Sequence, residues 1–101
     1  MDYLKGKVAL VIGGGGEMHR GVAVALAQAG ADIAVSGVVP DLAAEATLHS
    51  ISNEIWALGR RSTVVTLASD DAPGFAAAVE RAKEELGRAD LVVRADAVLG
   101  A

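Results

Sequence analysis

A regular alternation of short apolar runs with longer amphipathic segments constrains the fold of this chain more than any other feature. The apolar runs are rich in Val, Leu, Ile and Ala, as is typical of strands buried inside a parallel sheet, and they cover residues 8–12, 32–36, 62–67 and 90–93. The segments between them place apolar side chains at helical spacing, and each is followed by a glycine: Gly30, Gly59 and Gly87. Strict alternation with short loops implies parallel strands joined by right-handed crossovers. The sequence therefore predicts an α/β fold with a doubly wound parallel sheet.

The predicted helices cover residues 17–29, about 41–58 and about 70–86. Asp41 is placed to cap the second helix, and Asp70 and Asp71 to cap the third, which has Pro73 in its first turn. We expect a Rossmann-type sheet of four strands in the order 3-2-1-4, with the first two helices on one face and the third on the other. Ligands bind such sheets at the switch point, here between the first and fourth strands. No linker interrupts the chain, so we expect one domain over residues 1–101.

Four consecutive glycines, Gly13 to Gly16, follow the first predicted strand and precede the first predicted helix. Glycines at this place allow a tight turn and let backbone N–H groups approach a pyrophosphate, while the helix N-terminus adds about half a positive charge. The arrangement predicts a dinucleotide phosphate site. A tight turn with no ligand would need the same glycines, and this alternative stays open.

Charge and composition exclude several classes of function. The chain carries 9 Lys and Arg against 13 Asp and Glu, and it lacks the basic run that a nucleic-acid-binding surface requires. No apolar stretch reaches the roughly 18 residues of a membrane span. The absence of cysteine excludes disulfides and thiolate metal sites. We expect a cytoplasmic protein with no metal site and no nucleic-acid or membrane partner.

The chain resembles the N-terminal part of the short-chain dehydrogenases/reductases in two long segments, LKGKVALVIGGGGEMHRGVAVALAQAGADIAV and AAAVERAKEELGRADLVV. The resemblance covers essentially all 101 residues. The family pattern at the glycines is Thr-Gly-x3-Gly-x-Gly, of which Gly13 matches the first glycine. Ile12 replaces the threonine, and Glu17 and His19 replace the second and third glycines. The resemblance implies NAD or NADP as the cofactor, with its pyrophosphate held by the backbone of Gly13, Gly15, Gly16 and Met18.

Glu17 and His19 predict weak cofactor binding for two physical reasons. A carboxylate about 4 Å from a phosphate charge costs roughly 4 kcal/mol at an effective dielectric near 20, or about three powers of ten in affinity, unless it turns into water. An acid in the first turn of a helix is also favourable without any ligand. His19 at the third glycine is expected to push the helix away from the strand or to turn its ring into solvent. A solvated His19 is favoured over a metal ligand, because no second ligand stands at a suitable spacing.

Three further positions depart from what the family places around the cofactor. The loop after the second strand, residues 36–39, carries neither the acid of NAD-dependent members nor the Arg of NADP-dependent ones. Leu67-Ala68 replaces an Asp-Val pair that meets the adenine. Residues 94–97 read Arg-Ala-Asp-Ala instead of Asn-Asn-Ala-Gly. Arg94 is able to attract a phosphate, but a solvated charge is the favoured interpretation. Arg94 is also able to pair with Asp96, at little net energy if the pair is exposed. Core positions match the family, whereas the positions that would contact the cofactor mostly do not. This distribution of the differences predicts relaxed or lost cofactor binding.

The catalytic Ser, Tyr and Lys of the family lie beyond the fourth strand, so no catalytic residue is assigned. Tyr3 is the only tyrosine and precedes the first strand. We predict the N-terminal part of an NAD(P)-dependent alcohol or carbonyl oxidoreductase, truncated and inactive as this chain. The alternative is a non-catalytic assembly or scaffold module that keeps the fold without the cofactor. A third interpretation is a site reshaped for another anion, with His19 and Arg94 near the switch point.

The fourth predicted strand leaves a sheet edge open. Its apolar residues Leu91, Val92 and Val93 are then free to pair with another strand. We expect the chain to associate with a second copy or with a complementing fragment through this edge.

Overall fold

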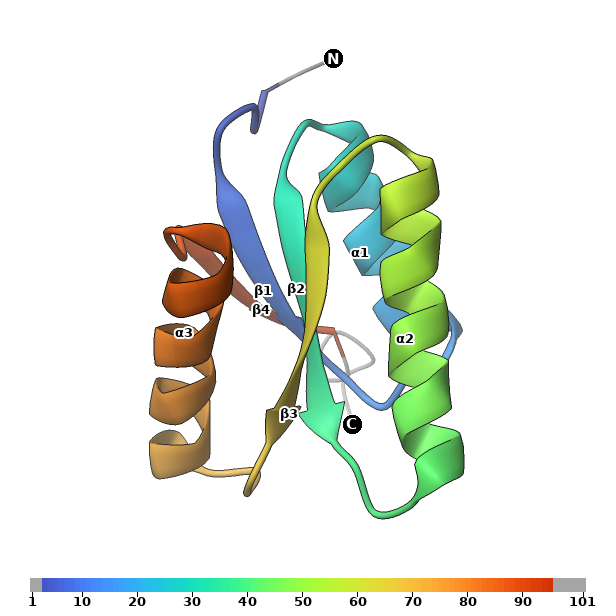
Figure 1. Cartoon of the computed structure of the whole chain (residues 1–101), viewed down its shortest axis with the longest axis vertical. Helices are drawn as coiled ribbons and strands as arrows, with labels where there is room; N and C mark the ends of the chain where they lie inside the picture. Colours follow the sequence, from blue (N-terminus) through green and yellow to red (C-terminus); the bar gives the residue numbers. More distant parts are fainter. Residues whose placement is uncertain (1–2, 96–101) are drawn as a thin grey trace.

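Four parallel strands form one sheet at the centre of the computed structural model, which describes residues 3–95 (Figure 1). The strands are β1 (Val8–Ile12), β2 (Asp32–Val38), β3 (Ser62–Leu67) and β4 (Leu91–Arg94), in the order β3-β2-β1-β4. β1 pairs with β2 from Val8 against Asp32 to Ile12 against Ser36. The predicted parallel sheet and its strand order are confirmed.

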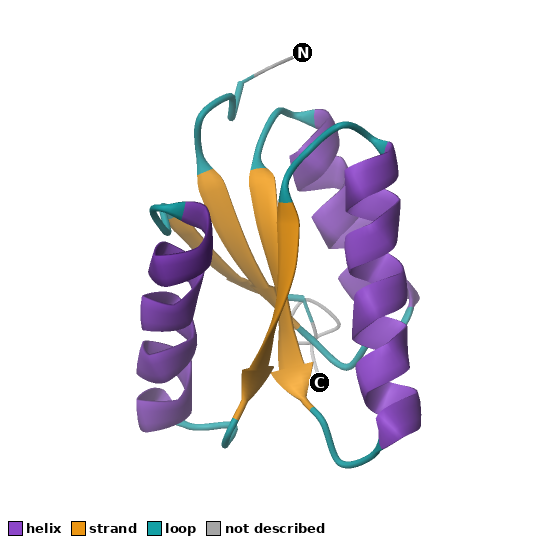
Figure 2. Ribbon diagram, viewed as in Figure 1, coloured by secondary structure: helices purple, strands orange, loops and turns teal. Residues whose placement is uncertain are grey.

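Three helices connect the strands: α1 (Glu17–Gln28), α2 (Leu42–Ala57) and α3 (Ala72–Leu86). α1 and α2 pack against one face of the sheet and α3 against the other, as Figure 2 shows. Each connection runs from the carboxyl end of one strand, through a helix, to the amino end of the next strand. The loops that enter the helices are therefore gathered at the carboxyl edge of the sheet.

β1 is buried on both faces because successive side chains of a strand point to opposite sides. Ala9 and Val11 belong to the core beneath α1 and α2, whereas Val8, Leu10 and Ile12 belong to the core beneath α3. None of the five is more than 3% exposed. Full burial of an aliphatic side chain is worth about 1.5–3 kcal/mol, so this strand anchors both halves of the core.

α1 packs on the sheet mainly through alanines, whereas α2 packs on it through larger aliphatic side chains. α1 buries His19, Ala23 and Ala27, with Val22 and Leu26 packed at the margin. α2 buries Leu48, Ile51 and Ile55 together with Ser52. Leu58, at the predicted end of this helix, follows the last turn of α2 and is 41% exposed.

Two strands differ in their bounds from the prediction, β2 in length and β4 by a shift of one residue. β2 extends to Val38 because Gly37 and Val38 still pair with Thr66 and Leu67 of β3. β4 begins at Leu91, one residue late, because its pairing with β1 begins at Leu91 opposite Ala9. Just before it, the Asp90 carboxylate accepts the Val8 N–H at 2.8 Å. The Arg88 guanidinium and that N–H hold the pKa of Asp90 below its usual value.

β4 forms one edge of the sheet, where Val92 is 51% exposed. The predicted association through this edge stays a prediction. Within residues 3–95, no helix has both the length and the apolar character needed to cross a lipid bilayer.

Candidate functional site

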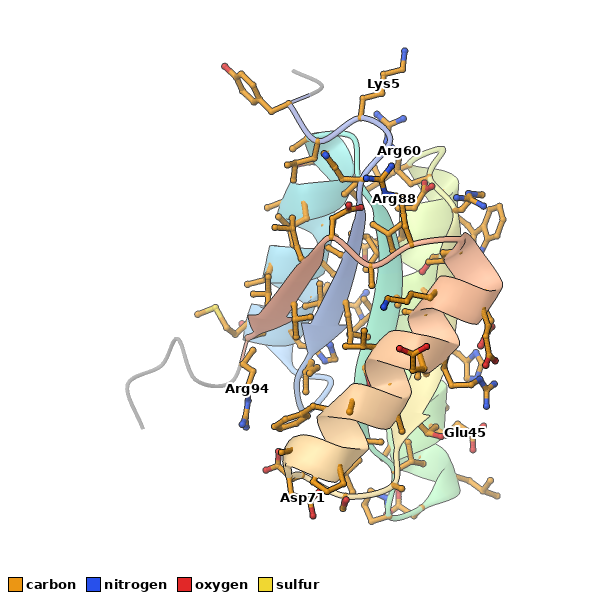
Figure 3. All side chains as sticks on the ribbon, turned by 90° about the vertical axis from the view of Figure 1, so that its left-hand side faces the viewer. Lys5, Glu45, Arg60, Asp71, Arg88 and Arg94 are labelled. Atoms are coloured by element: carbon orange, nitrogen blue, oxygen red, sulfur yellow. The ribbon has the colours of Figure 1, made fainter. Side chains whose placement is uncertain are left out.

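A hollow of about 180 Å³ lies at the carboxyl ends of β1, β2 and β3, and its lining residues are Ile12, Gly13, Gly14, Gly37, Val38, Leu67 and Asp70. Asp71 and Arg94 mark this end of the molecule in Figure 3, while Lys5, Arg60 and Arg88 lie at the opposite end. Sites for small molecules commonly enclose about 300–1,000 Å³. The hollow is therefore smaller than the sites that usually enclose a small molecule.

The four glycines at residues 13–16, here called the glycine loop, pack closely against the end of β2. The Gly13 N–H donates to the Ser36 carbonyl oxygen at 3.0 Å. A Cβ atom on Gly37 would lie 2.4 Å from the Gly13 carbonyl oxygen. Gly15 has a φ of +86°, a conformation that favours glycine. The loop therefore requires a glycine on β2 as well as its own.

His19 lies beneath the glycine loop, only 2% exposed, and the predicted solvent-facing ring is wrong. Its Nδ1 accepts the Gly15 N–H at 2.9 Å, and its Nε2 lies 2.9 Å from the Val11 carbonyl oxygen. The ring fits because Gly13 has no side chain: a Cβ atom there would lie 2.7 Å from the His19 Cγ. The expected outward displacement of the helix is also wrong, since Ala23 and Ala27 still pack fully buried.

The four residues predicted to hold a pyrophosphate, Gly13, Gly15, Gly16 and Met18, differ in what their amides do. The amides of Gly13 and Gly15 donate to Ser36 and His19 inside the protein. Gly16 is the N-cap of α1 and supplies no side-chain cap, and Met18 lies in the first turn, 36% exposed. First-turn amides have no partner within their own helix. Of the four, Gly16 and Met18 are therefore the ones placed to meet a ligand.

Asp71, and not Asp70, caps α3. Its carboxylate accepts the Gly74 N–H at 2.9 Å and the Ser69 hydroxyl at 2.6 Å. The hydrogen bond from Ser69, followed by that from Gly74, lowers the pKa of Asp71. A Cβ atom on Gly74 would lie 2.0 Å from the Ser69 carbonyl oxygen, so the cap also depends on that glycine.

Arg94 is held against α3, which corrects the prediction of a solvated charge. Its guanidinium lies over the Phe75 ring, 5.0 Å from the ring centre, and its Nη2 lies 3.4 Å from the Asp70 carboxylate. The predicted pair with Asp96 falls outside the described residues. Asp70 thus faces the hollow as part of an ion pair.

The walls of the hollow beside β2 and β3 carry no charged side chain within the strands. The Ser36 hydroxyl donates to the Val65 carbonyl oxygen, which joins β2 to β3. Val38 is 49% exposed, and Leu67 is 5% exposed. The surface that Val38 and Leu67 contribute to the hollow is apolar, with neither an acid nor an arginine at the end of β2.

In the part of the chain that the structure describes, Asp70 is the only ionisable side chain that lines the hollow. Tyr3 has Lys7 four residues later, the spacing of the family's Tyr and Lys, but it is 77% exposed and precedes the amino end of β1. The hollow lies at the carboxyl end of the same strand. Among residues 3–95, no three His, Asp or Glu side chains gather closely enough to hold a metal ion.

The burial of His19 and the requirement for glycine at position 37 are the features that sequence reasoning missed. A histidine four residues after a glycine of the loop is the only signal for the first. It does not distinguish a ring folded beneath the loop from one in solvent. In the sequence, Gly37 was noticed only because the loop at 36–39 carries neither an acid nor an arginine. The sequence does not show that a backbone carbonyl oxygen lies against this glycine.

The chain is similar in sequence to curated dehydrogenases, although no family model matches it. It is 38% identical over 90 residues to the 2-dehydro-3-deoxy-D-gluconate 5-dehydrogenase of Dickeya dadantii, covering 89% of this chain and 33% of that protein. It is 32% identical over 93 residues to the oxidoreductase UcpA of Escherichia coli, covering 92% and 33%. The chain thus spans about a third of the length of these relatives.

Solved structures share the fold over nearly all of the chain. A short chain dehydrogenase from Mycobacterium avium matches with a TM-score of 0.81 at 27% identity, over 93% of this chain and 34% of that one. A blue fluorescent protein from a metagenomic library, solved in complex with NADPH, matches with a TM-score of 0.74 at 31% identity, over 89% and 36%. Sequence and fold agree, and the chain belongs to the short-chain dehydrogenase/reductase family.

Proposed function

We propose that this chain is the dinucleotide-binding part of an NAD(P)-dependent oxidoreductase that acts on alcohols or carbonyls. The observation that carries the proposal is the hollow at the carboxyl edge of the sheet, which opens beside an α1 N-terminus that no side chain caps. Anions bind at such helix ends because N–H groups and the helix dipole both face them. The solved relative that holds NADPH supports this choice of ligand class.

The first turn of α1 is the part that would hold the pyrophosphate. Gly16 and Met18 are placed there, whereas the amides of Gly13 and Gly15 shape the loop from within. A Cβ atom on Gly16 or Gly14 would meet nothing within 4 Å, so the outer surface of the loop is open to a ligand. Glu17 is exposed and able to turn its carboxylate into water.

The apolar wall formed by Val38 and Leu67 suits the adenine end of the dinucleotide, since a flat ring gains most from apolar contact. The end of β2 offers no charged group to a ribose hydroxyl or to a 2′-phosphate. We therefore expect NADH and NADPH to bind with similar affinity. When bound, the nicotinamide supplies the hydride chemistry.

Hydride transfer to or from a substrate needs an acid/base group at the reacting oxygen. Among residues 3–95, the only ionisable side chain that lines the hollow is Asp70, and its carboxylate is paired with Arg94. The isolated chain is therefore expected to bind the cofactor without turning over an alcohol or a carbonyl substrate. No observation in the structure favours the alternative of a scaffold without ligand, and cofactor binding separates the two interpretations.

Calorimetric titration of the 101-residue chain with NADH and with NADPH tests the proposal. We expect saturable binding with dissociation constants of at most about 1 mM, or roughly −4 kcal/mol, within about threefold of each other. Nicotinamide mononucleotide, which lacks the pyrophosphate link and the adenine, serves as the control and is expected to bind at least about tenfold more weakly. Failure of both dinucleotides to bind at about 5 mM would overturn the proposal.

A further inference from the structure

We propose that His19 is a positioning residue that holds the glycine loop in its ligand-binding shape from beneath. This inference rests on the proposed function for its consequence in binding, and on the geometry of the loop for its structural part. His19 stands where the related pattern has a glycine, so the role belongs to a side chain that the pattern does not contain. The side chain lies in the interior, 2% exposed.

The two hydrogen bonds of His19 define one protonation state. The Val11 carbonyl oxygen only accepts, so the Nε2 atom 2.9 Å away must carry the proton. The Gly15 N–H only donates, so the Nδ1 atom 2.9 Å away must be unprotonated. The ring is therefore neutral and in the Nε2–H tautomer. In this state it links the end of β1 to the middle of the loop.

His19 and Gly13 also fit one another sterically. A Cβ atom on Gly13 would lie 2.7 Å from the His19 Cγ and 2.9 Å from its Nδ1. The ring thus occupies the space that a side chain at position 13 would need, and it supports the loop on the side away from the ligand. The neighbouring Gly14 has open space around its Cβ position, so a methyl group there would not meet the ring.

The hydrogen bonds of His19 to Val11 and Gly15, here called the lock, determine which amides meet the phosphates. With the Gly15 N–H directed at His19 and the Gly13 N–H at Ser36, the donors left for an anion are those at the start of α1. Without the acceptor on His19, the Gly15 amide would lose its partner and the loop would be free to leave the shape that presents those donors. Buried amides are seldom left unpaired, so the loop would rearrange.

Two variants of similar size separate the hydrogen bond from the packing. His19→Asn places an amide oxygen close to the position of Nδ1 and can still accept the Gly15 N–H, whereas His19→Leu fills the space without an acceptor. We expect His19→Leu to weaken NADPH binding about tenfold, which corresponds to about 1.4 kcal/mol, and His19→Asn to stay within about threefold of the wild type. Equal binding by wild type and His19→Leu would overturn the proposal.

Nuclear magnetic resonance of the full chain without ligand tests the lock even if NADPH does not bind or His19→Leu does not fold. Nitrogen shifts of the wild-type ring should show the Nε2–H tautomer, and the Gly15 amide should be protected from hydrogen exchange. A ring protonated at Nδ1, or a rapidly exchanging Gly15 amide, would overturn the proposal. If both signatures are present but neither dinucleotide binds, the lock stands and the proposed function fails.

The fit between Gly13 and His19 gives an independent check. Gly13→Ala should destabilise the wild type strongly and should cost much less in a His19→Gly background, where the ring is gone. Gly14→Ala, with open space around the new methyl group, is the matched control and should show no such coupling. Equal destabilisation by Gly13→Ala in both backgrounds would contradict the packing of the ring against position 13.

Discussion

The three helices begin at the same edge of the sheet, but they begin in two different ways. Asp41 caps α2 by accepting the Ala44 N–H at 2.8 Å, and Asp71 caps α3 by accepting the Gly74 N–H at 2.9 Å. α1 begins at Gly16, which has no side chain and leaves the first turn uncapped. The protein therefore caps two helix ends with its own side chains, whereas no side chain caps the third.

The same contrast extends to what supports each helix end. The starts of α2 and α3 are held by exposed carboxylates on the outside, within one helical turn. The start of α1 is supported from the inside, by the His19 ring and by the backbone of Gly37 against Gly13. Support from within keeps the outer surface of the loop clear, as a binding site requires. The difference predicts separate effects of substitution on stability and on binding.

Gly37→Ala is expected to have the largest effect. Its methyl group would lie 2.4 Å from the Gly13 carbonyl oxygen, a backbone atom that cannot rotate away. Overpacking of this kind costs about 3 kcal/mol, and urea unfolding should show the loss. The control is Gly21→Ala on the exposed side of α1, where the added methyl group meets nothing within 4 Å. Gly21→Ala should raise the free energy of unfolding by about 0.5–1 kcal/mol. A similar loss of stability in Gly37→Ala and Gly21→Ala would contradict the account.

Asp41→Ala is expected to lower the free energy of unfolding by about 1 kcal/mol, because the Ala44 amide loses its cap. NADPH affinity should remain within about threefold of the wild type, since α2 begins away from the proposed phosphate donors. Chemical denaturation and calorimetric titration of the same preparation measure both quantities. A parallel loss of affinity and stability would show that the capped and uncapped helix ends do not have separate roles.

Glu17→Gln should shift binding and stability in opposite directions. Removal of a negative charge at the start of α1 is expected to strengthen NADPH binding about threefold at low ionic strength, an effect that salt should reduce. The free energy of unfolding should fall by about 0.3 kcal/mol, because an acid near a helix N-terminus is favourable. Glu84→Gln, exposed on α3, is the charge-matched control. Weaker binding by Glu17→Gln would indicate that the carboxylate contributes to the site.

Asp71→Asn is expected to have the smallest effect on stability, and this effect should change with pH only in the acid range. The pKa of Asp71 is lowered in the folded protein, so its contribution to stability is present above the unfolded pKa of about 3.9 and is lost as the pH falls through the folded pKa. The stability difference between wild type and Asp71→Asn should therefore shrink as the pH is lowered from about 5 to about 2. Urea midpoints at several pH values measure this difference, and a constant value would contradict the assigned hydrogen bonds from Ser69 and Gly74.

The sequence predicted the architecture well because local patterns determine it. The apolar run at 8–12, flanked by glycines and an amphipathic helix, has few alternatives to a central parallel strand. The order of β3, β2, β1 and β4 follows from strict alternation with right-handed crossovers. The small errors at Val38 and Leu91 arise where pairing with a neighbouring strand, and not local pattern, sets the end of a strand.

The site was predicted less well because its geometry depends on contacts between distant parts of the chain. His19 was expected in solvent, and only the space above Gly13 explains its burial. Arg94 was expected to be solvated, and its contact with Phe75 joins residues far apart in sequence. Position in the family pattern shows which residue was replaced, but it does not show where the replacement side chain goes.

Gly16→Asp tests the central claim most directly, because it gives α1 the same kind of start as α2 and α3. The backbone of Gly16 is extended, with φ −81° and ψ −169°, and open space surrounds its Cβ position. The new carboxylate can therefore cap the first turn, leaving the free energy of unfolding within about 0.5 kcal/mol of the wild type. NADPH binding should fall by at least about 30-fold, because the carboxylate occupies the amides and repels the phosphates. Undiminished NADPH binding by this variant would contradict the account.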